Sequence, residues 1–173
     1  MKNLKPQHNK QIMADAQTAR AAYSKRYVLR TEIVSMNVIN YQISESYQVI
    51  EPNLHDSNLL SVEHDKNDTL IKFRSTSGEL IQAVASNVNK LVINDFREGN
   101  IVLDVTIERM VKIPDYGLDK LFVLSKVKCE KQDAYIRTVK DKIESGEMML
   151  VTINPSYGCN GMIYCENISF YKV

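Results

Sequence analysis

The chain has 173 residues, of which 44% are hydrophobic and 25% are charged, so it is long and apolar enough to bury a sizeable core. This composition excludes a wholly disordered chain, and the absence of an apolar run of about 18 residues excludes a membrane-spanning helix. Three cysteines, at positions 129, 159 and 165, are too few and too irregularly spaced for a disulfide framework, which favours a reducing cytoplasm.

The net charge of +1 conceals a gradient along the sequence. Residues 1–30 carry seven Lys/Arg and one Asp, residues 31–98 carry five basic and ten acidic groups, and residues 99–173 carry ten of each. A basic segment ahead of a mildly acidic body can contact phosphate, an acidic partner or the body itself. Abundant Asn, Lys and Ile without Trp is typical of an AT-rich genome, such as that of a phage or a low-GC bacterium.

A basic helical arm is predicted over residues 1–26, ahead of a strand-rich domain over residues 27–173. Within the arm, an apolar stripe recurs at helical spacing over residues 9–25: Ile12, Ala16, Ala19 and Tyr23. The stripe is mostly alanine and buries little area, so such a helix needs a partner surface. The arm either packs on its own domain or binds another subunit or nucleic acid.

The first half of the predicted domain contains short strands and one hairpin. Alternating apolar residues predict strands around residues 34–43, with a bend at Ile39 and Asn40, and residues 51–58 are predicted to be a loop. Residues 70–74 and 79–84 flank the turn Ser75-Thr76-Ser77-Gly78, which is typical of a hairpin. A further strand is expected over residues 91–93, followed by a polar turn over residues 94–100.

The second half has the clearest pattern. Residues 101–113 predict a long strand with Ile101, Leu103, Val105 and Ile107 on one face, and residues 120–130 predict another strand. A helix over residues 133–145 buries Ile136, Val139 and Ile143 and ends at Gly146; strands over residues 148–153 and 162–171 flank a loop. The fold class is therefore α+β, mainly antiparallel β, and the element order over about residues 80–173 is compatible with an OB-like barrel or with other α+β sheets.

No catalytic or phosphate-binding motif is present: the sequence lacks GxSxG, Walker A and GxGxxG patterns. Neither a catalytic residue nor a cofactor is predicted, and we expect a protein that is not an enzyme. Five potential metal ligands lie within eleven positions, but their spacing fits neither HExxH nor an EF-hand loop, so a solvated loop is the preferred interpretation and no metal is predicted: His55, Asp56, Glu63, His64 and Asp65.

Basic residues interleaved with aromatic residues give the main functional pattern. In proteins that bind single-stranded nucleic acid, cations follow the phosphates and aromatic rings stack on the bases. The same pattern also describes a solvated face of mixed charge. The candidate nucleic-acid-binding residues are Lys25, Arg26, Lys112, Tyr116, Lys120, Lys126, Lys128 and Tyr157.

The leading hypothesis is a non-enzymatic binding protein, namely a single-stranded nucleic-acid binder of a phage or mobile element. The alternative is a structural or assembly subunit of a virion or other multi-chain particle, in which the arm packs on a neighbouring subunit. Both hypotheses predict a homo-oligomer without a membrane partner, located in the cytoplasm or in a virion.

Overall fold

The computed structural model describes residues 37–114, 118, 121–122 and 130–173. The chain divides into two units, Met1–Met36 and Asn37–Val173, and every described residue belongs to the second. The predicted helix over residues 9–25 and the arm that contains it therefore lie outside the described residues.

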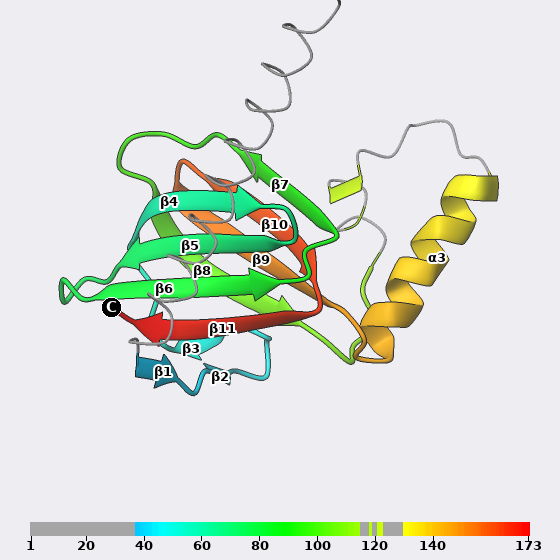
Figure 1. The fold of residues 1–173 in the computed structure, drawn as a ribbon, viewed down its shortest axis with the longest axis horizontal. Helices are drawn as coiled ribbons and strands as arrows, with labels where there is room; N and C mark the ends of the chain where they lie inside the picture. The colour runs from blue at the N-terminus through cyan, green and yellow to red at the C-terminus, as the bar shows by residue number, and fades with distance from the viewer. Residues whose placement is uncertain (1–36, 115–117, 119–120, 123–129) are drawn as a thin grey trace, which may run out of the picture. The chain divides into compact units, whose positions relative to one another are not determined.

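The described residues form strands β1 to β11 and helix α3 (Figure 1). Their bounds are β1 Asn37–Ile39, β2 Gln42–Ile43, β3 Val49–Glu51, β4 Asn58–Asp65, β5 Asp68–Arg74, β6 Leu80–Ser86, β7 Lys90–Asn94, β8 Ile101–Glu108, α3 Glu130–Glu144, β9 Met149–Tyr157, β10 Asn160–Cys165 and β11 Asn167–Lys172. One sheet has the antiparallel order β1-β11-β6-β5-β4-β8-β9-β10-β7, and β2 pairs separately with β3.

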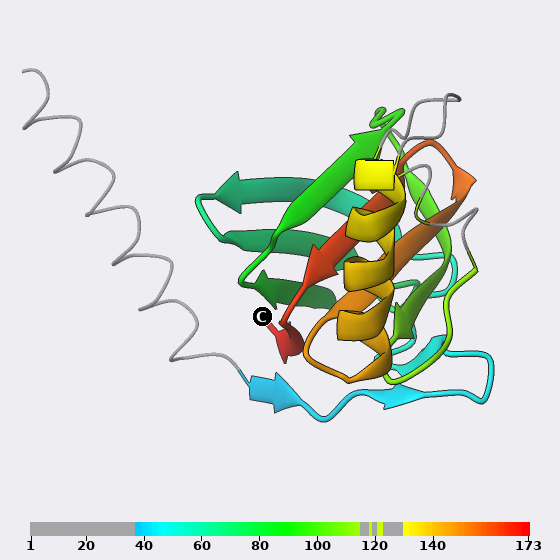
Figure 2. The same ribbon diagram turned by 90° about the vertical axis from the view of Figure 1, so that its right-hand side faces the viewer.

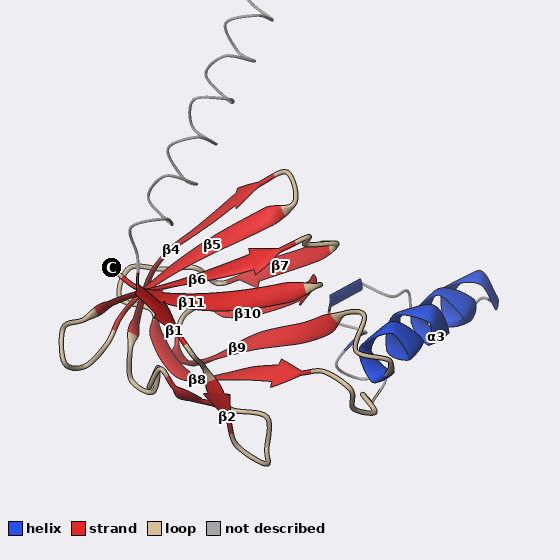
Figure 3. Cartoon of the chain, turned by 60° about the horizontal axis from the view of Figure 1, so that its bottom comes forward, coloured by secondary structure: helices blue, strands red, loops and turns tan. Residues whose placement is uncertain are grey.

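The nine-stranded sheet folds back on itself without closing into a barrel. Strands β10 and β11 are separated only by Glu166, yet β10 pairs with β9 and β7 while β11 pairs with β6 and β1. Strand β6 passes into β7 through a similar corner at residues 87–89. The front half, β1-β11-β6-β5-β4, therefore faces the back half, β8-β9-β10-β7, and the two halves also meet at the single pair Asn58 and Ile101 (Figures 1 and 3).

The main hydrophobic core lies between the two halves. Strand alternation points one side chain of every two inward, and the largest fully buried residues come from both halves: Ile71, Phe73, Ile107, Ile153, Ile163 and Phe170. Burying one such side chain contributes about 1.5–3 kcal/mol, so this layer holds the fold together.

Helix α3 covers a second, smaller core on the outer face of the back half (Figure 2). Ile136, Val139 and Ile143 recur on one side of the helix, as the sequence predicts, and are buried. The helix ends before Gly146, whose φ of +78° suits glycine. Among the described residues, no helix combines the length and apolarity needed to span a bilayer.

Several sequence predictions are confirmed. The hairpin of β5 and β6 forms around residues 75–79, the bend after Ile39 separates β1 from β2, and β7 and α3 lie where the sequence places them. The fold is α+β and mainly antiparallel β. An OB-like barrel over residues 80–173 is not confirmed, because β4 and β5, outside that range, belong to the same unclosed sheet.

Other predictions are wrong. Residues 121–122 are helical, not extended, and Leu118 and Leu121 are buried beside α3. Strand β8 ends at Glu108 rather than at residue 113. Residues 162–171 form two strands, because the corner at Glu166 moves the chain from one half of the sheet to the other. Glu63, His64 and Asp65 were interpreted as part of a solvated loop, but they belong to strand β4, which forms because Leu59 is buried against the core.

Candidate binding surface at the corner of the sheet

Three strands meet at one corner of the folded sheet. Ile101, the first residue of β8, pairs with Asn58 of β4 on one side and with Tyr157 of β9 on the other. Directly paired residues in a sheet project to the same face, and all three are exposed. This row forms the centre of a surface that faces away from the core.

Two β-bulges add leucines to this surface. The β8–β9 ladder passes from Val102 to Asp104, so Leu103 has no partner on β9. On β4, the ladder with β5 passes from Leu59 to Ser61, so Leu60 is likewise an extra residue. A bulge changes the phase of a strand and redirects a side chain, and both leucines are exposed as a result.

We call the resulting group the corner patch. Its large apolar or aromatic side chains are between 36% and 51% exposed: Leu60, Phe96, Ile101, Leu103 and Tyr157. Phe96 lies in the loop that leads from β7 into β8. Several large apolar side chains exposed on neighbouring segments are a common sign of an interaction site on a folded protein.

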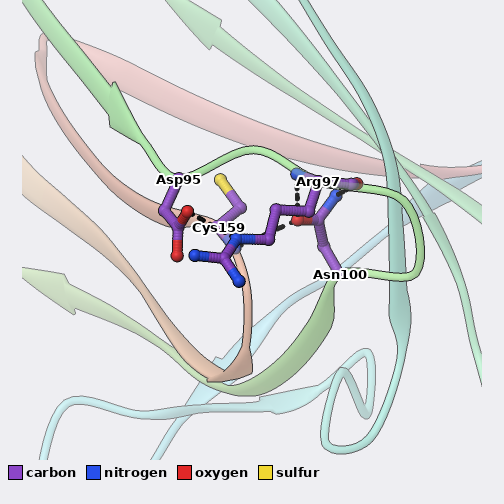
Figure 4. Close-up of polar contacts among 4 residues, drawn as sticks. All are labelled: Asp95, Arg97, Asn100 and Cys159. Atoms are coloured by element: carbon purple, nitrogen blue, oxygen red, sulfur yellow. Dashed lines mark hydrogen bonds and ion pairs between the residues drawn. The ribbon is translucent and has the colours of Figure 1, made fainter.

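Arg97 adds a cation to the corner patch. Its guanidinium carbon lies 5.9 Å from the centroid of the Tyr157 ring, and its Nε donates to Asp95 Oδ1 at 2.5 Å (Figure 4). The hydrogen bond that Arg97 donates to Asp95 raises the pKa of Arg97, and the neighbouring Tyr157 raises it further, so the guanidinium stays charged. Aromatic residues and arginine are the side chains that most often dominate binding energy in protein interfaces.

Asn100 fastens the loop behind the corner patch. Its Oδ1 accepts from the backbone N–H of Arg97 at 2.8 Å and of Cys159 at 3.1 Å, and its Nδ2 donates to the carbonyl of Arg97 at 2.5 Å (Figure 4). Its backbone carbonyl accepts from Leu59 N at 3.0 Å. One residue, only 2% exposed, thus joins the β7–β8 loop and the β9–β10 turn through its side chain and the start of β4 through its backbone.

The β9–β10 turn fits closely against Asn100. Gly158 has a φ of +82°, and a Cβ atom there would lie 2.5 Å from Asn100 Oδ1. Only glycine therefore satisfies both the backbone conformation and the close approach. The turn holds Tyr157 in place at the centre of the corner patch.

Cys159 and Cys165 are buried free thiols within and beside this turn. Burial raises the pKa of the Cys159 thiol, and it raises the pKa of Cys165 to about 12. Cys165 packs in a strand, as the sequence predicts, whereas the Cys159 loop thiol is not exposed.

Burial and raised pKa values should protect both thiols from alkylation, because the thiolate is the reactive form. In a Cys129→Ser variant, iodoacetamide at pH 8 should label Cys159 and Cys165 roughly 100-fold more slowly in the native protein than in guanidinium chloride. Mass spectrometry of quenched samples measures the two rates. Rapid native labelling of Cys159 would show that the β9–β10 turn is open.

Acidic residues occur in the segments that carry the corner patch. Asp56 precedes β4, Asp104 follows Leu103, and Glu98 lies in the Asn100 loop. The ring Nδ1 of His55 donates to the Leu103 carbonyl at 2.7 Å, which fixes the turn before β4 against β8. With Arg97 paired to Asp95, this surface favours a basic partner.

The five potential metal ligands do not form one cluster. His55 and Asp56 lie before β4, whereas Glu63, His64 and Asp65 lie at its far end, with His64 Nδ1 2.8 Å from Thr69 Oγ1. Within the described ranges, no three His, Cys, Asp or Glu side chains gather in a way that could hold a metal ion.

Of the predicted nucleic-acid-binding residues, only Tyr157 and Lys112 are described. They lie at opposite ends of the β8–β9 pair, because Tyr157 is opposite Ile101 while Lys112 follows Glu108, which is opposite Leu150. Seven residues of extended chain separate the two ends by about 23 Å. The other six candidates lie outside the described residues: Lys25, Arg26, Tyr116, Lys120, Lys126 and Lys128.

Sequence reasoning selected Tyr157 but missed its neighbours. Phe96 and Arg97 were interpreted only as part of a polar turn, although a phenylalanine in a turn of charged residues is itself a sign of an exposed contact. Leu60 and Leu103 could not be identified, since bulges leave no clear pattern in a single sequence.

Comparisons of the chain with models of protein families, with curated proteins and with solved structures give no match.

Proposed function

We propose that this chain is a non-enzymatic assembly subunit that associates with other copies of itself through the corner patch. The observation that carries the proposal is that Leu60, Phe96, Ile101, Leu103 and Tyr157 are exposed on the segments that meet where β4, β8 and β9 join, with Arg97 near the tyrosine ring. Such a mixture resembles the centre of a protein interface more than an ordinary surface.

A second copy is the favoured partner because charge within the chain is complementary. Residues 1–30 carry seven basic groups and one acidic group, whereas residues 31–173 carry 15 basic and 20 acidic groups. Each copy therefore offers both a basic segment and an acidic, partly apolar surface. Opposite charges steer association and suppress wrong partners, and apolar contacts supply most of the binding energy.

Sedimentation velocity tests this proposal. Wild-type protein should sediment as an oligomer, and Leu103→Asp should weaken self-association roughly 100-fold, because a charge is placed at the centre of a dry contact. Leu80→Asp is the matched control: Leu80 is a similarly exposed leucine at the start of β6, outside the corner patch, so this variant should associate like wild type.

Deleting residues 1–26 separates the contribution of the basic segment. If charge complementarity guides assembly, the deletion should weaken self-association and abolish its dependence on salt. A monomeric wild-type protein, or equal weakening by Leu103→Asp and Leu80→Asp, would contradict the proposal. Circular dichroism of each variant checks that the fold is retained.

Binding of single-stranded nucleic acid is the second candidate function. It is favoured by the exposed rings of Phe96 and Tyr157 beside Arg97, which could stack on bases, and by the basic residues 1–30. It does not require an OB-like barrel. A fluorescent oligonucleotide should then bind at low salt, with affinity reduced in Tyr157→Ala; absence of binding at low salt would exclude this function.

The location of the protein in the cytoplasm or in a virion, and its origin from a phage or mobile element, stay predictions.

A further inference from the structure

A second surface feature lies away from the corner patch, beneath helix α3. This cleft has a volume of about 510 Å³. Tyr135, Thr138 and Lys142 of α3 form one wall, and Asn67 and Asn87 from two strand connections form the other. Val139, Met148 and Tyr164 line it where the helix meets the sheet. A cleft with an apolar base and polar walls is typical of a small-molecule site.

Tyr164, one of the residues that line this cleft, has a hydroxyl without a hydrogen-bond partner among the described residues. The residue is only 3% exposed, and none of the described residues donates to or accepts from its Oη atom. An unpaired buried hydroxyl is costly, so such groups are usually satisfied by a ligand or by water. Burial raises the pKa of Tyr164 to about 12, so the hydroxyl is neutral and can accept a hydrogen bond from a bound donor.

The charges around the cleft favour a cation. Lys142 Nζ donates to Glu147 Oε1 at 2.6 Å, so these two groups neutralise each other. The Glu166 carboxylate accepts a hydrogen bond from Asn87 Nδ2 at 2.6 Å, and none of the described cations forms an ion pair with it. Asp68 lies behind it, where its Oδ1 accepts from Asn87 N at 3.3 Å. An anionic ligand would meet this uncompensated charge.

Aromatic side chains also lie at the cleft beneath α3. Phe122 contacts Tyr135 and Tyr164 edge-on, with ring centroids 5.2 Å and 6.0 Å apart. Two tyrosines of this group line the cleft, and aromatic rings beside a carboxylate are a recurrent environment for alkyl ammonium and guanidinium groups.

We propose that the cleft beneath α3 binds an organic cation, with an alkyl ammonium or guanidinium group held between Tyr164 and Glu166. The Tyr164 hydroxyl accepts one N–H, the Glu166 carboxylate supplies the opposite charge, and Tyr135 contacts the alkyl chain or the cation. This site is independent of the corner patch, so either proposal can fail without the other.

Isothermal titration calorimetry with four small probes tests the inference. Agmatine and n-pentylamine should bind saturably, whereas 1-pentanol, a neutral analogue of the amine, and pentanoate should not. Tyr164→Phe and Glu166→Gln should each lower amine affinity roughly tenfold, because each removes one polar contact. Glu45→Gln, which alters an exposed carboxylate in the β2–β3 turn, is the charge-matched control and should bind like wild type.

The shared chemistry could come from a free amine or from a lysine or arginine side chain of another chain. A blocked peptide with a single lysine distinguishes these sources: tighter binding than pentylamine indicates a protein ligand, and weaker binding indicates a free amine. Absence of saturable amine binding, equal binding of pentanol, or unchanged affinity in both Tyr164→Phe and Glu166→Gln would overturn the proposal. Amide chemical shifts in NMR spectra provide a second readout, since shifts should centre on residues 87–89 and 164–166.

Discussion

Replacing Asn100 by alanine is expected to lower the free energy of unfolding by about 3 kcal/mol. The substitution removes the acceptor that satisfies the backbone N–H groups of Arg97 and Cys159, and Cys159 is buried. An unsatisfied buried donor costs about 1–3 kcal/mol, which is more than a surface contact contributes. Urea denaturation followed by circular dichroism measures the change.

Asn89→Ala is the matched control, because Asn89 is exposed and none of the described residues hydrogen-bonds its side chain. That variant should unfold within about 0.5 kcal/mol of wild type. If Asn100→Ala were equally mild, the junction of the β7–β8 loop, the β9–β10 turn and β4 would not depend on this side chain.

Gly158→Ala is expected to cost a similar amount, about 3 kcal/mol. Alanine at φ +82° is strained, and its Cβ would displace Asn100 Oδ1 from the position in which it accepts from Cys159. Both substitutions disrupt the same hydrogen bond between Asn100 Oδ1 and Cys159 N, so their effects on the free energy of unfolding should not be additive. In the double variant Asn100→Ala/Gly158→Ala the clash is absent, and the total should be smaller than the sum by about 1–2 kcal/mol.

A second glycine substitution, measured by the same urea denaturation, is the control for Gly158→Ala. Gly78→Ala changes another glycine with positive φ, at +86°, but a Cβ there meets no atom within 4 Å. It should therefore show only the backbone penalty of about 1–2 kcal/mol. Strict additivity of the Asn100 and Gly158 changes would argue against the contact between them.

The sequence predicts best where local signals agree. The β5–β6 hairpin has alternating strands around a polar turn with glycine, and α3 has a regular apolar stripe that ends before Gly146. It predicts poorly where tertiary context overrides alternation. Ile101 and Leu103 share a phase with Val105 and Ile107 in the sequence, but the irregular pairing at the start of β8 buries Val102 instead and exposes both residues.

The same irregularities explain why most of the corner patch could not be predicted. Tyr157 is recognisable as an aromatic residue in a polar stretch, but its neighbours come from β4, the β7–β8 loop and β8, which only folding brings together. Tyr164 was predicted to lie in a strand, as it does, whereas the cleft that it lines depends on where α3 packs. Neither the corner patch nor the cleft beneath α3 is formed by residues at a regular spacing in the sequence.

The corner patch is held by a rigid frame. Asn100 and Gly158 fix the loops that carry Arg97 and Tyr157, so the surface is already organised before a partner binds. Pre-organisation lowers the entropy lost on association and therefore favours affinity. Asn100→Ala should weaken self-association as well as stability, even though Asn100 is buried.

Hydrogen exchange at two protein concentrations tests the proposed assembly surface most directly. The central claim predicts that amides in residues 58–61, 95–104 and 155–158 exchange more slowly when the protein is concentrated, while residues 80–86 exchange equally at both concentrations. Leu103→Asp should remove this difference. Concentration-dependent protection that is confined to other segments, or none at all, would contradict the claim that the corner patch binds a second copy.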